Sequence, residues 1–476
     1  MRVVRLLASS AATIVIGCSL VTPLDDLRRG SNDAGDPGDV SLDTGPAPTN
    51  CDASETSAAS GIFVSADGSD TTGSGLASAP FATITKGVAS ALQSASKDLY
   101  VAEGDYVEST GLLLTETAAG LRIHGGWKKT ATAWSKDCTT GFVDRTVLTS
   151  ATNVGVRVQF AVTSPAAEID GLTIRTKAQG ASPPDSGGES TYGVFVDANG
   201  ALKMTNAQIV AGKGGDGGAA SPQPAATTTV ACDGINGCGT GAAVGDGTVG
   251  TPGSTATYAK DGVHPSDGGQ GGTAPNGDNG AIGGGGTTSS CVTACVGQCQ
   301  SSDSCLNGSS AQVTSSKGKC GCGGVGGTGG KPGHGGGAAI GAWVGPNAQL
   351  FIDYTRVVAT GGGAGSIGGS GGAGALGGAG APGVGVTCNK QCGRNGPVGG
   401  ACACVFTQTM SLPGGNAGGA GSKGGTGGAG GSGAGGDAFG AVLFGGGTLV
   451  IPDAQRVVFA VGAAGSGGSR GTQITK

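Results

Sequence analysis

The sequence has few of the side chains that most enzymes and nucleic-acid-binding proteins depend on. Of its 476 residues, 4% are aromatic, 12% are charged and three are histidine. So few histidines leave few general bases and zinc ligands. The net charge of −5, without a basic block, argues against a nucleic-acid partner. No later stretch is apolar enough to span a membrane, and no phosphate loop or dinucleotide-binding motif is supported, so we expect no cofactor.

Glycine, in contrast, is abundant. It makes up 104 of the 476 residues, against about 7% in an average protein. Because glycine is unfavourable inside long helices, this composition argues against an ordinary α/β enzyme and favours an all-β fold.

The N-terminal residues have the pattern of an export signal. Basic residues precede an apolar stretch that ends at Gly17, followed by Cys18. The run Val15-Ile16-Gly17-Cys18 resembles a bacterial lipobox. The resemblance implies that residues 1–17 are a lipoprotein signal peptide and that Cys18 carries the lipid, making the bilayer a partner. The alternative is an ordinary secretory signal. Ser19 is not the aspartate associated with inner-membrane retention, so the resemblance favours the outer membrane or cell surface.

Residues 18–60 are rich in Asp, Gly, Pro, Ser and Thr and predict a flexible tether. Apart from Cys18, fourteen cysteines remain, and an even number in an exported chain favours disulfides over a thiolate metal site. Cys51 is expected to form a disulfide that links the tether to the folded part. The disulfide candidates are Cys51, Cys138, Cys232, Cys238, Cys291, Cys295, Cys299, Cys305, Cys320, Cys322, Cys388, Cys392, Cys402 and Cys404. We expect no metal.

Order is expected to begin near residue 62 with a short strand. Apolar residues recurring every three or four positions over Thr83–Ala95 then predict an amphipathic helix, capped by Thr83 or Thr85. The flanking motifs are Phe63-Val64-Ser65, Gly68-Ser69-Asp70, Gly73 and Pro80-Phe81-Ala82-Thr83-Ile84. This module resembles the N-terminal part of bacterial right-handed parallel β-helix proteins of the pectin-lyase-like superfamily. The resemblance implies that the helix plugs one end of a β-helix, and it carries no activity.

Short apolar, β-branched stretches downstream predict further strands. The candidates are 99–101, 111–114, 121–123, 146–148, 156–158 and 172–174. A strand–turn–strand unit then occurs three times, in residues 192–204, 340–352 and 439–451. These copies continue into the apolar pairs 209–210, 357–358 and 457–458. Their spacing predicts stacked rungs with long insertions between them.

The insertions carry glycine at every third position over long runs, such as 362–383 and 418–436. A period of three matches an extended helix with three residues per turn, whose bare glycine stripe lets neighbouring chains pack closely. Proline is too scarce for collagen. Packed polyglycine-II-like segments are therefore expected, with disordered low-complexity chain as the alternative.

The expected fold is an all-β, right-handed parallel β-helix with a capping helix and glycine-rich insertions. Its parts are 61–211, the cap and first rungs; 212–339, a Gly/Cys-rich insertion; 340–360, a rung; 361–438, a second insertion; and 439–476, the last rung and tail.

No catalytic constellation is evident. The paired-aspartate and Gly-His-Gly motifs of β-helix glycan hydrolases are missing, and His124 is not assigned a catalytic role. Asp170, Arg175, Asp197 and Lys203 could share one face. Convergence of three acidic residues with a basic neighbour on one face would favour an enzyme.

Three aromatic residues, Tyr106, Trp127 and Trp134, are the candidate platform for stacking on a glycan. The expected function is a non-catalytic surface lipoprotein with a structural, adhesive or glycan-contacting role. Its expected partner is an envelope or extracellular polysaccharide or a surface protein. The alternative is a polysaccharide lyase or hydrolase.

Overall fold

The structure is a computed structural model. It describes residues 50–51, 60–130, 133–159, 165–295, 299–301, 304–305, 308–389, 392–393, 405–406 and 409–476. Leu42–Lys476 form one compact unit. The described fold is all-β, as expected, with one α-helix, α1 (Ile84–Ala91), and three short 3₁₀ helices, η1 (Glu116–Ala118), η2 (Phe142–Arg145) and η3 (Ala454–Arg456).

Two sheets of mainly parallel strands form the base of the fold. The 12-stranded sheet contains β1 (Ile62–Val64), β2 (Asp98–Ala102), β3 (Gly104–Glu108), β5 (Arg122–Lys129), β6 (Trp134–Lys136), β7 (Thr146–Ser150), β9 (Ala167–Asp170), β10 (Thr173–Thr176), β12 (Ala201–Ala211), β20 (Gln349–Ala359), β26 (Thr448–Val450) and β27 (Val457–Val461). The six-stranded sheet contains β4 (Leu112–Thr115), β8 (Val154–Gln159), β11 (Thr191–Val196), β19 (Ala339–Val344), β25 (Ala438–Leu443) and β28 (Arg470–Thr475).

The chain alternates between the two sheets as it advances. From β8 onward it returns repeatedly to the six-stranded sheet, and each new strand there pairs in parallel with the previous one. A continuous core of fully buried aliphatic side chains joins the two sheets, including Leu202, Leu350 and Val194. Burial of this apolar surface is the main force holding the sheets together.

The three sequence repeats stack on one another in register. Tyr192 faces Ile340, and Ile340 faces Phe439, across neighbouring strands. Leu202 faces Leu350 in the same way. Each copy of the repeat therefore occupies one strand position in each of the two sheets.

The final strand of the third copy departs from the predicted alignment. The sequence pairs Val457 with Val357, but in the structure Val357 faces Phe459, and Val457 faces Thr355. In the third copy η3 interrupts the path between β26 and β27, whereas β20 is continuous. This extra turn shifts the register.

The N-terminal motifs have a structural role around α1. Thr83 caps the helix, because its side chain accepts a hydrogen bond from the Lys86 amide. Asp70 accepts from the amides of Ala82 (2.8 Å) and Thr83 (3.1 Å). Gly68 lies against the Pro80 and Phe81 carbonyls, where a Cβ would come within 2.4 Å of an oxygen. The motif residues thus fix the entry of the helix.

The helix is shorter than predicted. It ends at Ala91, and Leu92 is its C-cap. The periodic pattern extends to Ala95, but the chain turns there to enter β2, with Lys97 in the left-handed region (φ 51°). The need to reach the sheet therefore overrides the helical pattern.

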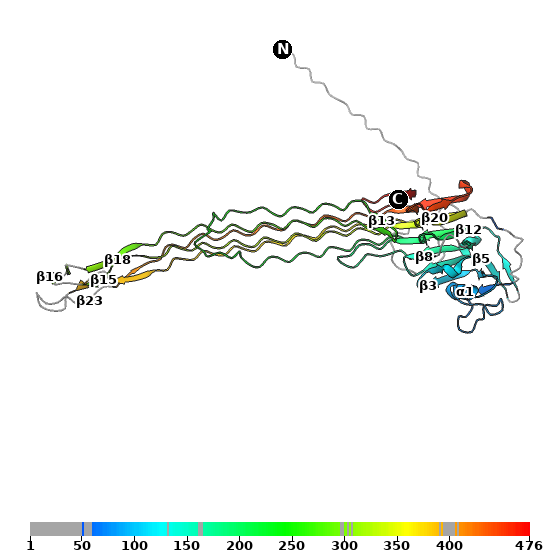
Figure 1. The fold of residues 1–476 in the computed structure, drawn as a ribbon, viewed down its shortest axis with the longest axis horizontal. Helices are drawn as coiled ribbons and strands as arrows, with labels where there is room; N and C mark the ends of the chain where they lie inside the picture. Colours follow the sequence, from blue (N-terminus) through cyan, green and yellow to red (C-terminus); the bar gives the residue numbers. More distant parts are fainter. Residues whose placement is uncertain are drawn as a thin grey trace, which may run out of the picture. The chain divides into compact units, whose positions relative to one another are not determined.

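Glycine-rich segments extend from the two sheets. Four of them lead to and from distal hairpins, and the other two, 212–232 and 241–256, are joined by the loop 233–240 and hydrogen-bond to these four. The segments are 212–232, 241–256, 265–287, 315–338, 360–385 and 413–437, which we call the glycine bundle. The hairpin strands are β15 (Thr288–Cys295) with β18 (Gly308–Thr314), β16 (Cys299–Ser301) with β17 (Ser304–Cys305), β21 (Val386–Asn389) with β24 (Thr409–Leu412), and β22 (Cys392–Gly393) with β23 (Val405–Phe406). Figure 1 shows the segments running side by side between the sheets and the hairpins.

The bundle is held together by backbone hydrogen bonds that recur every third residue. Segment 360–385 donates to segment 315–338 from Ser366, Gly369 and Gly372. Segment 413–437 donates in turn to segment 360–385 from Gly424, Gly427 and Gly430. These bonds have the period of the glycine spacing. In the glycine bundle, hydrogen bonds between backbone groups hold the segments together, whereas packed side chains do so in an ordinary core.

A further hairpin, β13 (Thr257–Ala259) and β14 (Gly262–His264), covers the outer face of the six-stranded sheet. Val263 packs there in an aromatic cluster around Trp343, which stacks on Phe195 with centroids 5.6 Å apart. Trp343 is fully buried.

Candidate functional site

Charged side chains from four adjacent strands lie in rows across the 12-stranded sheet. Asp98, Arg122, Glu168 and Lys203 occupy neighbouring positions on β2, β5, β9 and β12. Their signs alternate, so each acid lies beside a base. Arg122 Nε is 2.7 Å from Asp98, and Lys203 Nζ is 3.4 Å from Glu168. Such cross-strand pairs favour the observed register.

A second row contains the only histidine in this part of the sheet and a fully hydrogen-bonded aspartate. His124 Nε2 lies 3.3 Å from Asp98 Oδ1, and the His124 ring stacks on Tyr100. Asp170 accepts from Lys136 Nζ at 2.8 Å and from the hydroxyl of Thr205 at 2.9 Å. The Lys136 side chain is only 4% exposed.

These residues line a pocket of about 210 Å³ that the N-terminal chain partly covers. The pocket is lined by Asn50, Cys51, His124, Lys136, Glu168, Asp170, Thr205 and Asn206. The amide of Asn50 donates to Asn206 Oδ1 at 2.6 Å, and Cys51 forms a disulfide with Cys138. The predicted disulfide at Cys51 is therefore present, and it holds this chain segment at the pocket.

The convergence of Asp98, Glu168 and Asp170 with basic neighbours meets the condition stated for an enzyme. Each of the three carboxylates, however, already has a cationic partner. A general base must accept a proton from a substrate, and an ion-paired carboxylate is poorly suited to that task. The described site offers many hydrogen-bonding groups to a polar ligand, and its three carboxylates are all ion-paired.

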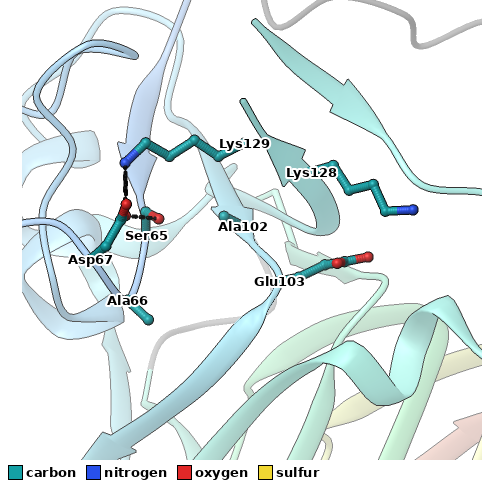
Figure 2. Close-up of a pocket in the computed structure, with 7 residues that line it drawn as sticks. All are labelled: Ser65, Ala66, Asp67, Ala102, Glu103, Lys128 and Lys129. Atoms are coloured by element: carbon teal, nitrogen blue, oxygen red, sulfur yellow. Dashed lines mark hydrogen bonds and ion pairs between the residues drawn. The ribbon is translucent and has the colours of Figure 1, made fainter. Parts of the chain in front are cut away.

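A second pocket, of about 300 Å³, lies between β1, β2 and β5 (Figure 2). On one side Lys129 Nζ lies 2.7 Å from Asp67 Oδ1, which also accepts from Ser65. These hydrogen bonds, that from Lys129 first, hold the pKa of Asp67 below its usual value. Glu103 and Lys128 lie on the other side.

Beside this pocket, the carboxyl groups of Glu103 and Asp137 are paired with the same Arg145 nitrogen. Burial raises the pKa of Glu103, and its hydrogen bond with Asp137 raises it further. Burial also pushes the pKa of Asp137 upward, but hydrogen bonds from Thr139, Glu103 and Lys128 outweigh burial and lower that pKa to about 2. Arg145 bridges both carboxyl groups.

Opposed pKa shifts in two carboxyl groups are a pattern found in acid–base sites. The spacing nevertheless does not suit glycoside cleavage. Glycosidase carboxyl groups lie about 5–9.5 Å apart to flank the bond and the attacking group. Arg145 Nη1 lies between Glu103 and Asp137 and contacts both, and the Asp137 side chain is 3% exposed. The pair is therefore a structural contact in which Asp137 is buried and Glu103 is half-buried.

The predicted glycan-stacking platform is wrong. Trp127 is 1% exposed, Tyr106 3% and Trp134 8%. Trp127 and Trp134 pack with Phe63, and the Tyr106 hydroxyl donates to the Ala102 carbonyl. Stacking on a sugar needs an exposed ring face, and these three rings are buried in the core.

The four charged residues proposed to share a face are divided among three places. Asp170 and Lys203 lie in the charged rows described above. Asp197 instead forms a two-pronged ion pair with Arg157 beside the six-stranded sheet, at 2.7 and 2.8 Å. Arg175 is exposed on β10. Alternation of side chains along a strand and between sheets separates them.

The described part of the chain contains three disulfides. Besides Cys51–Cys138, Cys232 bonds to Cys322 and Cys238 bonds to Cys320. Cys232 ends segment 212–232 and Cys238 lies in the loop that follows it, so the two later bonds join this part of the chain to segment 315–338. Cys18 and the side chains of eight other candidates lie outside the described residues: Cys291, Cys295, Cys299, Cys305, Cys388, Cys392, Cys402 and Cys404.

Two contacts made by carboxyl groups could not be predicted from the sequence. Glu108 on β3 accepts hydrogen bonds from the amides of Ile84 (2.8 Å) and Thr85 (3.2 Å) at the start of α1. Glu103 and Asp137 come together only because β5 and β6 form an antiparallel hairpin. No local spacing could have indicated either contact.

Comparison with known proteins gives no relative. No protein-family model matches the chain, and no curated protein or solved structure shows significant similarity. Among the described residues, no helix could cross a membrane, and no group of three His, Cys, Asp or Glu is arranged to hold a metal ion.

Proposed function

We propose that this protein is a non-catalytic surface lipoprotein that holds two hairpins away from the membrane, in a structural, adhesive or glycan-contacting role. In this proposal the two sheets form a right-handed parallel β-helix, and the glycine bundle is polyglycine-II-like. Cys18 carries the lipid, and the chain is located at the outer membrane or cell surface.

The observation that carries the proposal is the three-residue hydrogen-bond period of the glycine bundle. Segments 265–287 and 315–338 lead to and from one hairpin, and segments 360–385 and 413–437 lead to and from the other. At about 3.1 Å per residue, segment 360–385 would extend about 80 Å. A bundle fixed by backbone bonds along its length is suited to displaying its ends.

The β-helix assignment is supported by parallel, in-register stacking of the sequence repeats and by the alternation of the chain between the two sheets. The N-terminal motifs around α1 support it as well, because they resemble the capping module of such proteins.

A polysaccharide lyase or hydrolase is the second candidate. The observation favouring it is the convergence of Asp98, His124 and Asp170 near the pocket of about 210 Å³. The ion pairing of the two aspartates weighs against it.

The test is incubation of the purified protein with neutral and acidic polysaccharides, with and without calcium, recording both retention and new chain ends. Retention without cleavage supports a glycan-contacting role. If the protein neither retains nor cleaves a polysaccharide, the structural or protein-adhesive role remains. New chain ends that disappear in an Asp170→Asn variant would overturn the non-catalytic proposal.

A further inference from the structure

Segment 360–385 lies on the surface of the glycine bundle. It is hydrogen-bonded to segments 315–338 and 413–437 along most of its length and to segment 212–232 at several positions. Near the sheets a fourth neighbour, the C-terminal stretch 462–468, also contacts it. Farther out, no described chain takes the place of this fourth neighbour.

The C-terminal stretch shows how that place is filled. The amide of Gly362 donates to the Ala463 carbonyl at 3.0 Å, and the amide of Gly465 donates to the Gly436 carbonyl at 2.9 Å. The next amides at the same three-residue spacing as Gly362 are those of Gly365, Gly368, Gly371, Gly374 and Gly377. Within the described chain these amides have no backbone acceptor.

The same segment exposes an unusual apolar row. With three residues per turn, every third side chain points in one direction. The row is Ala364, Ile367, Ser370, Ala373, Leu376, Ala379 and Pro382, all exposed except the half-buried Ala373. Ile367 is 81% exposed and Leu376 is 76% exposed.

Segment 360–385 also contains no charged residue. A protein with a net charge of −5 repels a second copy of itself, but an uncharged surface avoids close like-charge contacts. A second chain that covers such a surface removes the apolar row from contact with water, which favours association.

We propose that segment 360–385 is a docking surface for the glycine bundle of a second copy of this chain. The second copy would continue the contact that residues 462–468 make near the sheets. It would supply carbonyl acceptors for the free amides and bury Ile367 and Leu376. A second copy is the fitting occupant because it contains extended glycine-rich segments with the same three-residue period.

The main experiment is sedimentation of the full-length protein in detergent over a range of concentrations. We expect concentration-dependent dimers that an Ile367→Lys/Leu376→Lys variant weakens at least about tenfold. Both side chains are exposed, so this variant should keep the wild-type circular dichroism spectrum. The control is Val249→Lys, also 72% exposed but on segment 241–256, which should leave association unchanged.

A second experiment tests the location directly. A Ser370→Cys variant, treated with a bis-maleimide, should give a covalent dimer that the wild-type protein does not. The proposal would be overturned if Val249→Lys weakened the dimers as much as the double variant does. It would also be overturned if the wild-type protein stayed monomeric and the Ser370→Cys variant gave no cross-link.

Discussion

Gly371 and Gly427 lie on neighbouring antiparallel segments, so close that a Cβ on Gly371 would come within 2.0 Å of the Gly427 carbonyl oxygen. Equivalent contacts occur three residues away on each side, at Gly368 with Gly430 and at Gly374 with Gly424. The three-residue glycine period is therefore a steric requirement of the glycine bundle. Any side chain at these positions would push the segments apart.

Substitution of Gly371 should destabilise the glycine bundle. We expect Gly371→Ala to cost about 1–3 kcal/mol, as overpacking does in a dense interior. Hydrogen–deuterium exchange should show faster exchange in segments 360–385 and 413–437. Gly245→Ala is the matched control, because nothing lies within 4 Å of its Cβ position, and it should change little. Equal exchange in both variants would contradict the steric argument.

The disulfides of the glycine bundle should act locally. Replacing Cys232 and Cys322 with serine removes one cross-link, worth about 2–4 kcal/mol, and should speed amide exchange in segment 212–232. Strands β11 and β12 should keep their protection, because the apolar core holds them. A Cys51→Ser/Cys138→Ser variant should instead affect residues near η2. Unfolding of the whole protein in the first variant would show that the bundle is integral to the core.

The carboxyl pair beside the pocket in Figure 2 predicts a specific pH dependence. The pKa of Asp137 is lowered to about 2 in the folded protein, so ionised Asp137 stabilises the fold above its unfolded pKa of about 3.9. This contribution, about 2 kcal/mol, is lost as the pH falls through about 2. Asp137→Asn should therefore lower the melting temperature at pH 6 but not near pH 2.

Glu103 contributes with the opposite sign. Its pKa is raised, so its contribution is present below the unfolded pKa and is lost as the pH rises through the folded pKa. Glu103→Gln should consequently reduce stability less at pH 7 than at pH 4. The exposed Asp278→Asn is the control for both variants. Melting curves that are parallel at all pH values would argue against the pair.

The proposed lipid anchor can be tested at one residue. Cys18→Ser should prevent lipid attachment and release the protein from the membrane fraction. Metabolic labelling with a fatty acid should be lost in parallel. Continued membrane partition and labelling of the variant would contradict anchoring through Cys18.

Much of the fold could be predicted from local patterns. The repeats at Tyr192, Ile340 and Phe439 predicted strands that do stack, because identical spacing gives identical burial. The helix and a threonine cap at Thr83 or Thr85 were predictable because caps and periodicity are local, and the structure shows that Thr83 is the cap. The helix end and the shift at Phe459 were not, because both depend on how the chain turns to meet the next strand.

By itself, the sequence determined the all-β character, the stacking of the repeats and the steric period of the glycine bundle, because these follow from side-chain size and spacing along the chain. Tertiary structure alone decided which charges meet. The β5–β6 hairpin brings Lys136 to Asp170, and it brings Asp137 to Arg145, which also pairs with Glu103. Tertiary structure also decided that Trp127 is buried and Leu376 exposed. Which side of a residue is covered depends on neighbours distant in the sequence, and no local pattern contains that information.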